Sequence, residues 1–403
     1  MTRIPGFAVI LATFGVQTLA SMAALVLPAI ATTAGAALGL DPVLIGIQVS
    51  LLYATAMLAA LTSSAVIRRF GACRTSQVAL FLVAAGCCAA SLPSIWAVAS
   101  GSLLLGLAYG LPNPAASHLL QRFTDVRRRN LIYSFKQAGV PAGGVLAGLL
   151  APTLANTFFW QAPLLLAAFL ALGLAAVLQL ARVSWDDDRD ASGAAFRLPL
   201  NGLASLVRNA SLRFMALTGL LLAAVQLCLV AFLVVALVEE LGYGAIAAGA
   251  MLAFLQAVSV CGRIGWGWIA DRIGDGLAVL IFLCLILAGS FFAASTFGLA
   301  TPAALVIPLF IVISSTAVGW NGIFLAEIAQ ASGPARVGEI TGSAMFFTYL
   351  GVVVGPAAFT VIQPVFGGIL PAYVVLALAS LAACALLVAA RTRLRDGSSL
   401  PGR

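Results

Sequence analysis

Two positively charged side chains, Lys136 and Arg263, lie inside long apolar stretches of the sequence. A full charge in hydrocarbon is costly, so a residue of this kind is expected to have a partner or a function. Neither apolar stretch contains an acidic residue, and two buried like charges call for an anion between them. Because a guanidinium can hold a carboxylate through two parallel hydrogen bonds, the pair predicts a binding site for a small organic anion. A lysine in place of Arg263 should not preserve that site.

The spacing of nearby charges places both cations at a similar depth. Arg263 precedes Asp271 by eight residues, roughly 12 Å of helix rise, and Lys136 follows Arg129 by seven, roughly 10 Å. One alternative stays open, in which Arg263 pairs with helix-end carbonyls or with Asp271 and fastens the two halves of the protein together. In that case the Lys136 side chain reaches toward the membrane surface.

Uncharged polar side chains are expected to complete the site. Gln17 lies on a polar face of an otherwise apolar helix, and Gln256 shares a helical face with Arg263. Prolines on both sides of Asn113 predict a kink at that point. Cavity lining and hydrogen bonding between helices remain alternatives for side chains of this type. The five candidates are Gln17, Asn113, Gln226, Gln256 and Asn321.

The composition places these residues in a membrane protein. Hydrophobic residues make up 62% of the 403 positions and charged residues 8%, whereas soluble chains average about half apolar and a quarter charged. Apolar runs of roughly 17 to 25 residues mark transmembrane helices. Twelve such runs are found, near 8–34, 43–67, 75–92, 95–118, 131–154, 160–181, 212–238, 244–268, 276–296, 302–330, 338–363 and 368–390.

A repeated spacing divides the twelve helices into two halves. Gly249 and Gly274 are 25 residues apart, as are Gly46 and Gly71, and the two pairs are 203 positions apart. An internal echo of this kind is typical of two structural repeats. We therefore expect an all-α membrane protein with two pseudo-symmetric six-helix bundles, residues 1–181 and 212–403, joined by a linker over residues 182–211.

The distribution of positive charge predicts the orientation in the membrane. Apart from Lys136 and Arg263, the 21 Lys and Arg residues fall at the termini or in every second loop, and the other loops carry only acidic charges. The positive-inside rule then places both termini in the cytoplasm. Twenty arginines against one lysine suggest a bacterial source, so we expect a multi-pass protein of the bacterial cytoplasmic (inner) membrane. The net charge of +8 reflects this topology and does not indicate nucleic-acid binding.

Motifs of enzymes and of metal or cofactor sites are missing. A single histidine and seven cysteines without a C-x-x-C pair do not provide a zinc site. The acidic run Asp186–Asp190 has the chemistry of metal ligands, but a contiguous charge run is more typical of a solvated loop. We therefore expect a protein that is not an enzyme and that uses no cofactor and no metal.

The segment that contains Gly267, Asp271, Arg272 and Gly274 resembles the loop motif between paired helices of the major facilitator superfamily of transporters. The resemblance implies a secondary transporter whose two bundles give alternating access to a central site in the lipid bilayer, and we expect it to be a monomer. In that family the acid that corresponds to Asp271 helps to lock the cytoplasmic helix ends in one conformation. The first half has Arg68 in place of this acid, so its copy of the motif is degraded.

The position of Arg263, eight residues before the acid that ends its helix, is also similar to the oxalate/formate antiporter and to monocarboxylate carriers, where this arginine binds substrate carboxylate. That similarity implies a carboxylate substrate, moved together with a coupling proton or in exchange for a counter-anion. Two positions depart from the pattern. Ser259 replaces the acid of proton-linked monocarboxylate carriers, and Thr348 replaces a lysine of the oxalate exchanger, whereas Lys136 stands on the fifth predicted helix.

Glycines and prolines in the fifth and eleventh predicted helices are expected to act as hinges or packing sites. The run from 139 to 144 loosely resembles a Gly-Pro-rich motif of antiporters in the superfamily, although glycines permit close helix packing in any carrier. The residues concerned are Gly139, Pro141, Gly143, Gly144, Gly355 and Pro356.

Glu327 lies close to the cytoplasmic end of the tenth predicted helix, where we expect it either to pair with a loop arginine or to carry a proton. Two other functions remain alternatives to anion transport. Proton-coupled export of drugs or other hydrophobic compounds is disfavoured because Ser102 replaces an arginine that such exporters usually have. A membrane receptor or assembly factor on the same fold would bind a ligand without moving it.

Overall fold

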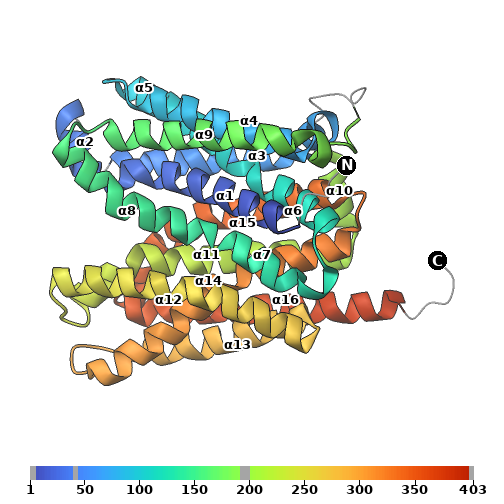
Figure 1. The fold of residues 1–403 in the computed structure, drawn as a ribbon. Helices are drawn as coiled ribbons and strands as arrows, with labels where there is room; N and C mark the ends of the chain where they lie inside the picture. The colour runs from blue at the N-terminus through green and yellow to red at the C-terminus, as the bar shows by residue number, and fades with distance from the viewer. Residues whose placement is uncertain (1–5, 40–43, 191–199, 399–403) are drawn as a thin grey trace. The chain divides into compact units, whose positions relative to one another are not determined.

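The computed structural model describes residues 6–39, 44–190 and 200–398, and within these ranges every regular element is a helix (Figure 1). The helices of the first half are α1 (Gly6–Ala29), α2 (Ala31–Leu38), α3 (Leu44–Phe70), α4 (Ala72–Ala90), α5 (Ile95–Gly110), α6 (Pro112–Phe123), the 3₁₀ turn η1 (Val126–Arg128), α7 (Arg129–Gln137), α8 (Gly139–Thr157) and α9 (Ala162–Trp185). The later helices are α10 (Leu200–Arg208), α11 (Ala210–Glu239), α12 (Ala245–Ile273), α13 (Gly276–Ala294), α14 (Ala303–Ser332), α15 (Val337–Ile362), η2 (Gln363–Phe366) and α16 (Ile369–Ser398).

Twelve segments of the described chain are long and apolar enough to cross a membrane. Most are single helices, but α5 and α6 together form one span, as do η1, α7 and α8, and as do α15 and η2. The predicted all-α membrane protein with twelve transmembrane helices is therefore confirmed.

Two of the spans are interrupted where proline and glycine occur. The fourth span breaks between Gly110 and Pro112, because proline lacks a backbone N–H and fits the first turn of a new helix. The fifth span breaks between Gln137 and Gly139. The breaks place Asn113 in the first turn of α6 and Lys136 in the last turn of α7, so both side chains lie beside an interrupted helix.

The contacts between residues divide the chain into two compact units. Unit 1 comprises Met1–Val126, Phe135–Leu203 and Ser332–Phe346. Unit 2 comprises Arg127–Ser134, Ala204–Ala331 and Phe347–Arg403. Helices α7, α10 and α15 contribute residues to both units, and α10 lies within the stretch predicted as a linker. The division into transport domains at 182–211 stays a prediction.

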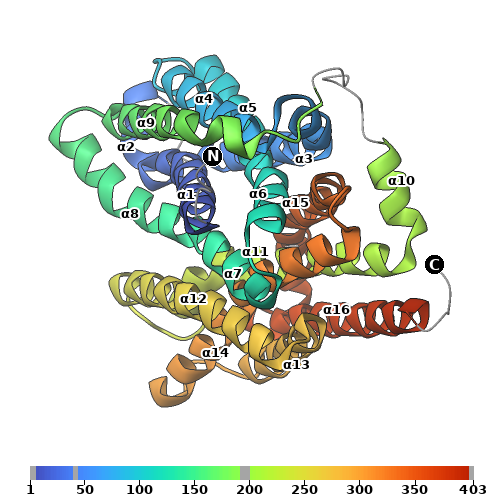
Figure 2. The same ribbon diagram turned by 45° about the vertical axis from the view of Figure 1, so that its right-hand side comes forward.

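The core of each unit is built from closely packed helix pairs. In unit 1, α1 runs along α8, α3 packs on α5, and α4 packs on α5 and α9 (Figure 1). Gly143 allows the approach of α8 to α1, since a Cβ at this position would lie 2.6 Å from the backbone nitrogen of Met22. In unit 2, α11 and α13 pack on α16 (Figure 2), and Gly355 of α15 lies so close to α11 that a Cβ would lie 2.6 Å from the Cβ of Ala224. Small residues therefore set the helix spacing in both units.

Candidate functional site

The only lysine of the chain is buried at the end of α7, with 1% of its surface exposed. The Nζ of Lys136 donates hydrogen bonds to the side-chain oxygens of Gln17 at 2.7 Å, of Gln137 at 3.0 Å, and of Asn113. These acceptors come from α1, α7 and α6, and all belong to unit 1. We call Lys136, Gln17, Asn113 and Gln137 the lysine cluster. Its three acceptors are neutral amides, so they satisfy the ammonium N–H groups without cancelling the positive charge.

The orientation of the amides adds hydrogen-bond donors to this positive site. Because the side-chain oxygens of Gln17 and Asn113 face the ammonium, their NH₂ groups are turned away from it. The Nε2 of Gln17 is buried and has no hydrogen-bond partner among the described residues, and neither has the hydroxyl of Ser21 one turn further along α1. The Nδ2 of Asn113 contacts the sulfur of Met345 at 3.4 Å, a weak acceptor. A ligand with acceptor oxygens would fit this combination of charge and donors.

Arg263 is buried in α12, with 2% of its surface exposed, and belongs to unit 2. The helix around it is held against α14, because Ser259 Oγ donates to the backbone oxygen of Ser314 at 3.1 Å and Gly262 packs on the backbone of Ser315. Gln256, on the same helix, is partly exposed. Lys136 and Arg263 belong to different units, so their predicted joint hold on one anion stays a prediction.

A second polar cluster lies inside unit 2. The Oε1 of Gln226 in α11 accepts hydrogen bonds from Trp320 Nε1 at 3.1 Å and from Asn321 Nδ2 at 2.9 Å. Both donors come from α14, and Trp320 is fully buried. We call these three residues the glutamine cluster. It contains no charge, so its hydrogen bonds are complete without an ion.

The loop motif after α12 fastens the start of α7. The carboxylate of Asp271 accepts hydrogen bonds from the backbone N–H groups of Asn130 at 3.0 Å and of Leu131 at 2.8 Å, the arrangement of a carboxylate at a helix N-terminus. Gly267 lies against Ser134 of the same helix, where a Cβ would lie 2.6 Å from the serine Cβ. All of these residues belong to unit 2.

The other motif residues end α12. Gly274 adopts a left-handed conformation with φ of 73°, which terminates the helix, and the Arg272 guanidinium stacks over Trp268 at 4.8 Å. In the fifth span, Gly139 and Gly143 face α1, a Cβ added at Gly144 would lie 3.3 Å from a methyl group of Leu25, and Pro141 is buried. Pro356 lies inside α15, directly after Gly355.

The acidic run after α9 is exposed from Asp187 to Asp190, as predicted for a solvated loop, but its first residue is not. Asp186 is buried, and its carboxylate accepts hydrogen bonds from the backbone nitrogens of Cys73 at 2.7 Å and Arg74 at 2.9 Å, so it caps α4. The next two aspartates form ion pairs, Asp187 with Arg122 at 2.5 Å and Asp188 with Arg122 at 2.7 Å. Burial raises the pKa of the Asp186 carboxyl, and its two backbone hydrogen bonds oppose that rise. The burial of Asp186 was not predicted, because a repeat of aspartates gives no sign of which one turns inward.

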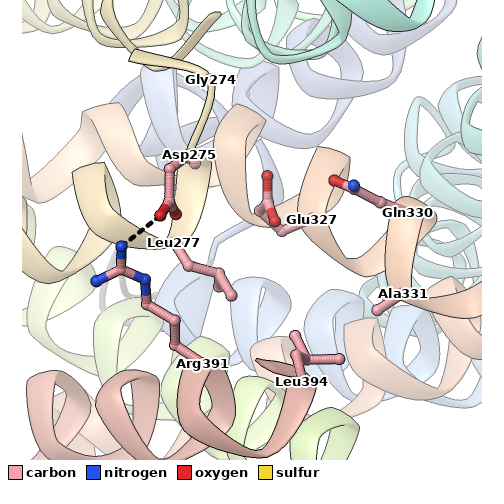
Figure 3. A pocket seen from close by; sticks show the side chains of 9 residues that line it. Gly274, Asp275, Leu277, Glu327, Gln330, Ala331, Arg391 and Leu394 are labelled. Atoms are coloured by element: carbon pink, nitrogen blue, oxygen red, sulfur yellow. Dashed lines mark hydrogen bonds and ion pairs between the residues drawn. The ribbon is translucent and has the colours of Figure 1, made fainter. Parts of the chain in front are cut away.

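Sequence analysis also missed Asn130, which lies in the first turn of α7 with 6% of its surface exposed. Its Nδ2 donates to Asp271 at 3.0 Å, in addition to the backbone bond from the same residue. An asparagine at the start of a predicted helix is a signal for capping chemistry, and it could have been used. Glu327, in the last third of α14, lines a pocket of about 390 Å³ together with Asp275 and Arg391 (Figure 3).

Comparison with known proteins places this geometry in a familiar fold. A sequence profile described as Major Facilitator Superfamily matches residues 7–356. No curated protein matches the chain significantly in sequence. Among solved structures, the chain is similar to the E. coli fucose:proton symporter, with a TM-score of 0.76, 15% identity and coverage of 95% of this chain and 98% of that chain.

Two further solved structures are similar over nearly their whole length. The human organic anion transporter MFSD10 gives a TM-score of 0.75 with 17% identity, over 96% of this chain and 100% of that chain. The proton:xylose symporter gives 0.73 with 13% identity, over 95% of each chain. At these identities the similarity is one of fold.

Proposed function

Because the chain belongs to the major facilitator superfamily and is therefore a membrane transporter rather than an enzyme, we propose that it is a secondary transporter of a small organic anion, in particular a carboxylate. The solved structures with this fold include carriers of sugars and of an organic anion, so the fold leaves the substrate class open. The proposal is supported by one observation, the buried ammonium of Lys136 with the side-chain amides of Gln17 and Asn113 around it.

The lysine cluster supports an anion on energetic grounds. Moving a cation out of water costs several kcal/mol, on the order of 2.5 to 3.5 in membrane-insertion measurements, and neutral acceptors recover only part of that cost. A carboxylate would interact favourably with the charge of the ammonium and would also accept a hydrogen bond from the unpartnered Nε2 of Gln17. A neutral sugar or a cation would supply no negative charge.

Arg263 supports the same substrate class from the second unit. Its guanidinium is buried in a helix that lacks acidic residues until Asp271, and it can hold a planar carboxylate through two parallel bonds. We propose that Lys136 and Arg263 bind one anion during alternating access, with Asn113, Gln226, Gln256 and Asn321 as further polar contacts. The same proposal places both chain termini in the cytoplasm and the protein in a bacterial inner membrane.

Counterflow in proteoliposomes tests the proposal. Purified protein is reconstituted and assayed with labelled formate, acetate, lactate, oxalate and succinate, with fucose and a lipophilic cationic dye as non-anionic probes. We expect exchange of at least one carboxylate. We also expect Lys136→Ala and Arg263→Ala each to lower that exchange about 100-fold or more, because each leaves the bound anion without a buried partner. Arg263→Lys should fail as well, since an ammonium cannot make the paired contacts.

Arg213→Ala is a matched control. This cation stands at the start of α11 and donates to the backbone oxygen of Val207 at 2.9 Å, so its loss should change exchange by less than about twofold. Unchanged carboxylate exchange in both Lys136→Ala and Arg263→Ala would overturn the anion site. Dye movement that survives the loss of both cations would indicate a drug exporter, and binding of a carboxylate without flux would indicate a receptor.

A further inference from the structure

One carboxylate of unit 2 receives no hydrogen bond from the described residues. Glu327 opens into the pocket of about 390 Å³ that is also lined by Gly276, Leu277 and Gln330 (Figure 3). A second carboxylate of the pocket, Asp275, is differently placed. It accepts from Arg391 Nη2 at 2.5 Å and from the backbone nitrogen of Ala278 at 2.9 Å, so its charge is paired, whereas that of Glu327 has no donor.

A second unpartnered acceptor meets Glu327 at the start of α13. The Nδ2 of Asn130 donates to Asp271 at 3.0 Å, which fixes the orientation of the amide, and the Oδ1 is left buried without a partner. A Cβ added to Gly276 would overlap the Glu327 carboxylate and would lie 3.1 Å from the Oδ1 of Asn130. The two acceptor oxygens therefore converge on the same glycine, and the absence of a side chain there is what lets them approach.

We propose that Glu327 is a proton-binding site whose protonated carboxyl donates a hydrogen bond to Asn130 Oδ1. Two converging acceptors are stable only with a donor between them. Water from the pocket is an unsuitable donor, because Asn130 Oδ1 has no solvent-exposed surface and Asn130 does not line the pocket. Glu327 does line the pocket, so a hydronium ion there transfers its proton to the carboxylate and leaves a water molecule behind, and release reverses this step.

The charged groups around Glu327 come from four elements. Arg129 of α7, Asp271 of α12 and Asp275 before α13 interact with it electrostatically, and Arg391 of α16 lines the same pocket. Neither arginine forms an ion pair with Glu327 in the described part of the chain. Arg129 Nη2 donates to the side-chain oxygen of Gln330, and Arg391 is bound to Asp275. The expected ion pair between Glu327 and a loop arginine is therefore not formed among the described residues, and the proposal assigns a proton to Glu327 instead.

The proton site is connected to the lysine cluster through one short helix. Asn130 lies in the first turn of α7 and Lys136 in the last, a rise of roughly 9 Å. When Glu327 loses its proton, the two acceptors repel, and relief by rotation of the Asn130 amide breaks its hydrogen bond to Asp271. Proton occupancy therefore biases the capping of α7, and by linkage an anion at Lys136 biases proton binding to the same extent. This last step rests on the proposed function and makes the proton the coupling ion.

Hydrogen exchange on the purified protein tests the site without any substrate. The backbone amides of Asn130 and Leu131 donate to Asp271, so their protection reports the cap. After correction for the intrinsic exchange rate, we expect protection in the wild type to fall about tenfold as the pH rises from acidic to alkaline values and Glu327 loses its proton. Glu327→Gln keeps a donor facing Asn130 and should show constant, high protection across that interval.

Asp275→Asn is the matched control, because it removes a carboxyl of the same pocket that is already paired. Protection should still depend on pH in this variant, with the fall moved to lower pH because the negative charge of Asp275 no longer opposes ionisation of Glu327. If Glu327→Gln does not fold, the infrared band of the protonated carboxyl decides the question. Asn130→Ala removes the acceptor for the protonated carboxyl, so it should move the titration of Glu327 to lower pH. A titration of Glu327 that does not move overturns the proposal. Protection that is independent of pH in the wild type, or equally dependent in Glu327→Gln, also overturns it. Neither readout involves a carboxylate substrate, so its failure is distinct from failure of the anion proposal.

Discussion

The lysine cluster and the glutamine cluster occupy corresponding positions in the two halves of the sequence, and they differ in charge. Gln17 and Gln226 are 209 positions apart, and Asn113 and Asn321 are 208 apart. In unit 1 the amide oxygens accept from an ammonium, whereas in unit 2 the oxygen of Gln226 accepts from an indole and an amide. The glutamine cluster therefore contains only neutral donors and acceptors, whereas the lysine cluster contains a buried ammonium.

The difference arises at a single helix position. Thr348 of α15 stands at the position that corresponds to Lys136 of α7. The Oγ1 of Thr348 lies beside Gly219 of α11, which is two turns before Gln226. A repeat that had kept its symmetry would have two lysines or two threonines at these positions. Under the proposed function, one charged and one neutral cluster would contribute unequally to binding. The charge of unit 1 would supply binding energy, and the amides of unit 2 would supply hydrogen bonds whose loss is less costly.

Moving the positive charge from the lysine cluster to the other half of the chain is the change with the largest expected effect on exchange. Lys136→Thr should lower carboxylate exchange about 100-fold or more, because the site loses its ammonium. Adding Thr348→Lys places an ammonium in the other half, within reach of the glutamine cluster, and should restore exchange to within about tenfold of the wild type. Initial rates of counterflow check both values. A double variant as inactive as Lys136→Thr would mean that the position of the charge decides binding as well as its sign.

Removing one glutamine from each cluster sharpens the comparison. Gln17→Leu deprives the buried ammonium of an acceptor and the anion of a donor, so we expect KM to rise by roughly 10- to 100-fold, the cost of about 1 to 3 kcal/mol for an unsatisfied buried polar group. Gln226→Leu leaves only neutral donors unsatisfied in a partly exposed place, and we expect a rise of less than about fivefold. Equal effects of the two variants on KM would contradict the unequal roles of the clusters.

The sequence was sufficient for the fold and for the inventory of polar residues, because hydrophobicity, loop charge and helical spacing are local properties. It named Lys136, Gln17 and Asn113 as candidate binding residues, and the structure brings these three side chains into contact. It did not reveal Gln137 as a partner. That contact depends on the break of the fifth span directly after Gln137, which lets neighbouring residues turn to the same point.

Helix capping by distant carboxylates was beyond sequence reasoning. Asp186 and Asp271 each accept from two successive backbone N–H groups of a helix at least 112 positions away. Glu240 does the same for the start of α16, with the backbone nitrogens of Ile369 at 2.5 Å and Leu370 at 2.7 Å. Which carboxylate meets which helix end is decided by tertiary packing, and no pattern along the chain encodes it. The burial of Asp186 went unpredicted for this reason, and the Asp271 role came from family resemblance alone.

The caps also allow the smallest test of the difference between the units, since Asp186 of unit 1 lies outside the apolar spans. Its folded-state pKa is raised by burial, so the folded protein retains a proton that the unfolded chain has already lost. The free energy of unfolding should therefore decrease as pH rises through the interval between the unfolded and folded pKa values, and should stay constant above it.

Asp186→Asn keeps an acceptor for the N–H groups of Cys73 and Arg74 but cannot titrate. We expect it to abolish this decrease at a net change in stability of about 1 kcal/mol, measured by thermal unfolding in detergent across acidic pH. Glu339→Gln, which removes a partly exposed carboxylate paired with Arg336 at 3.4 Å, should leave the decrease in place. A decrease that persists in Asp186→Asn would assign the titration to another group. It would also mean that the Asp186 cap of unit 1 does not respond to protons.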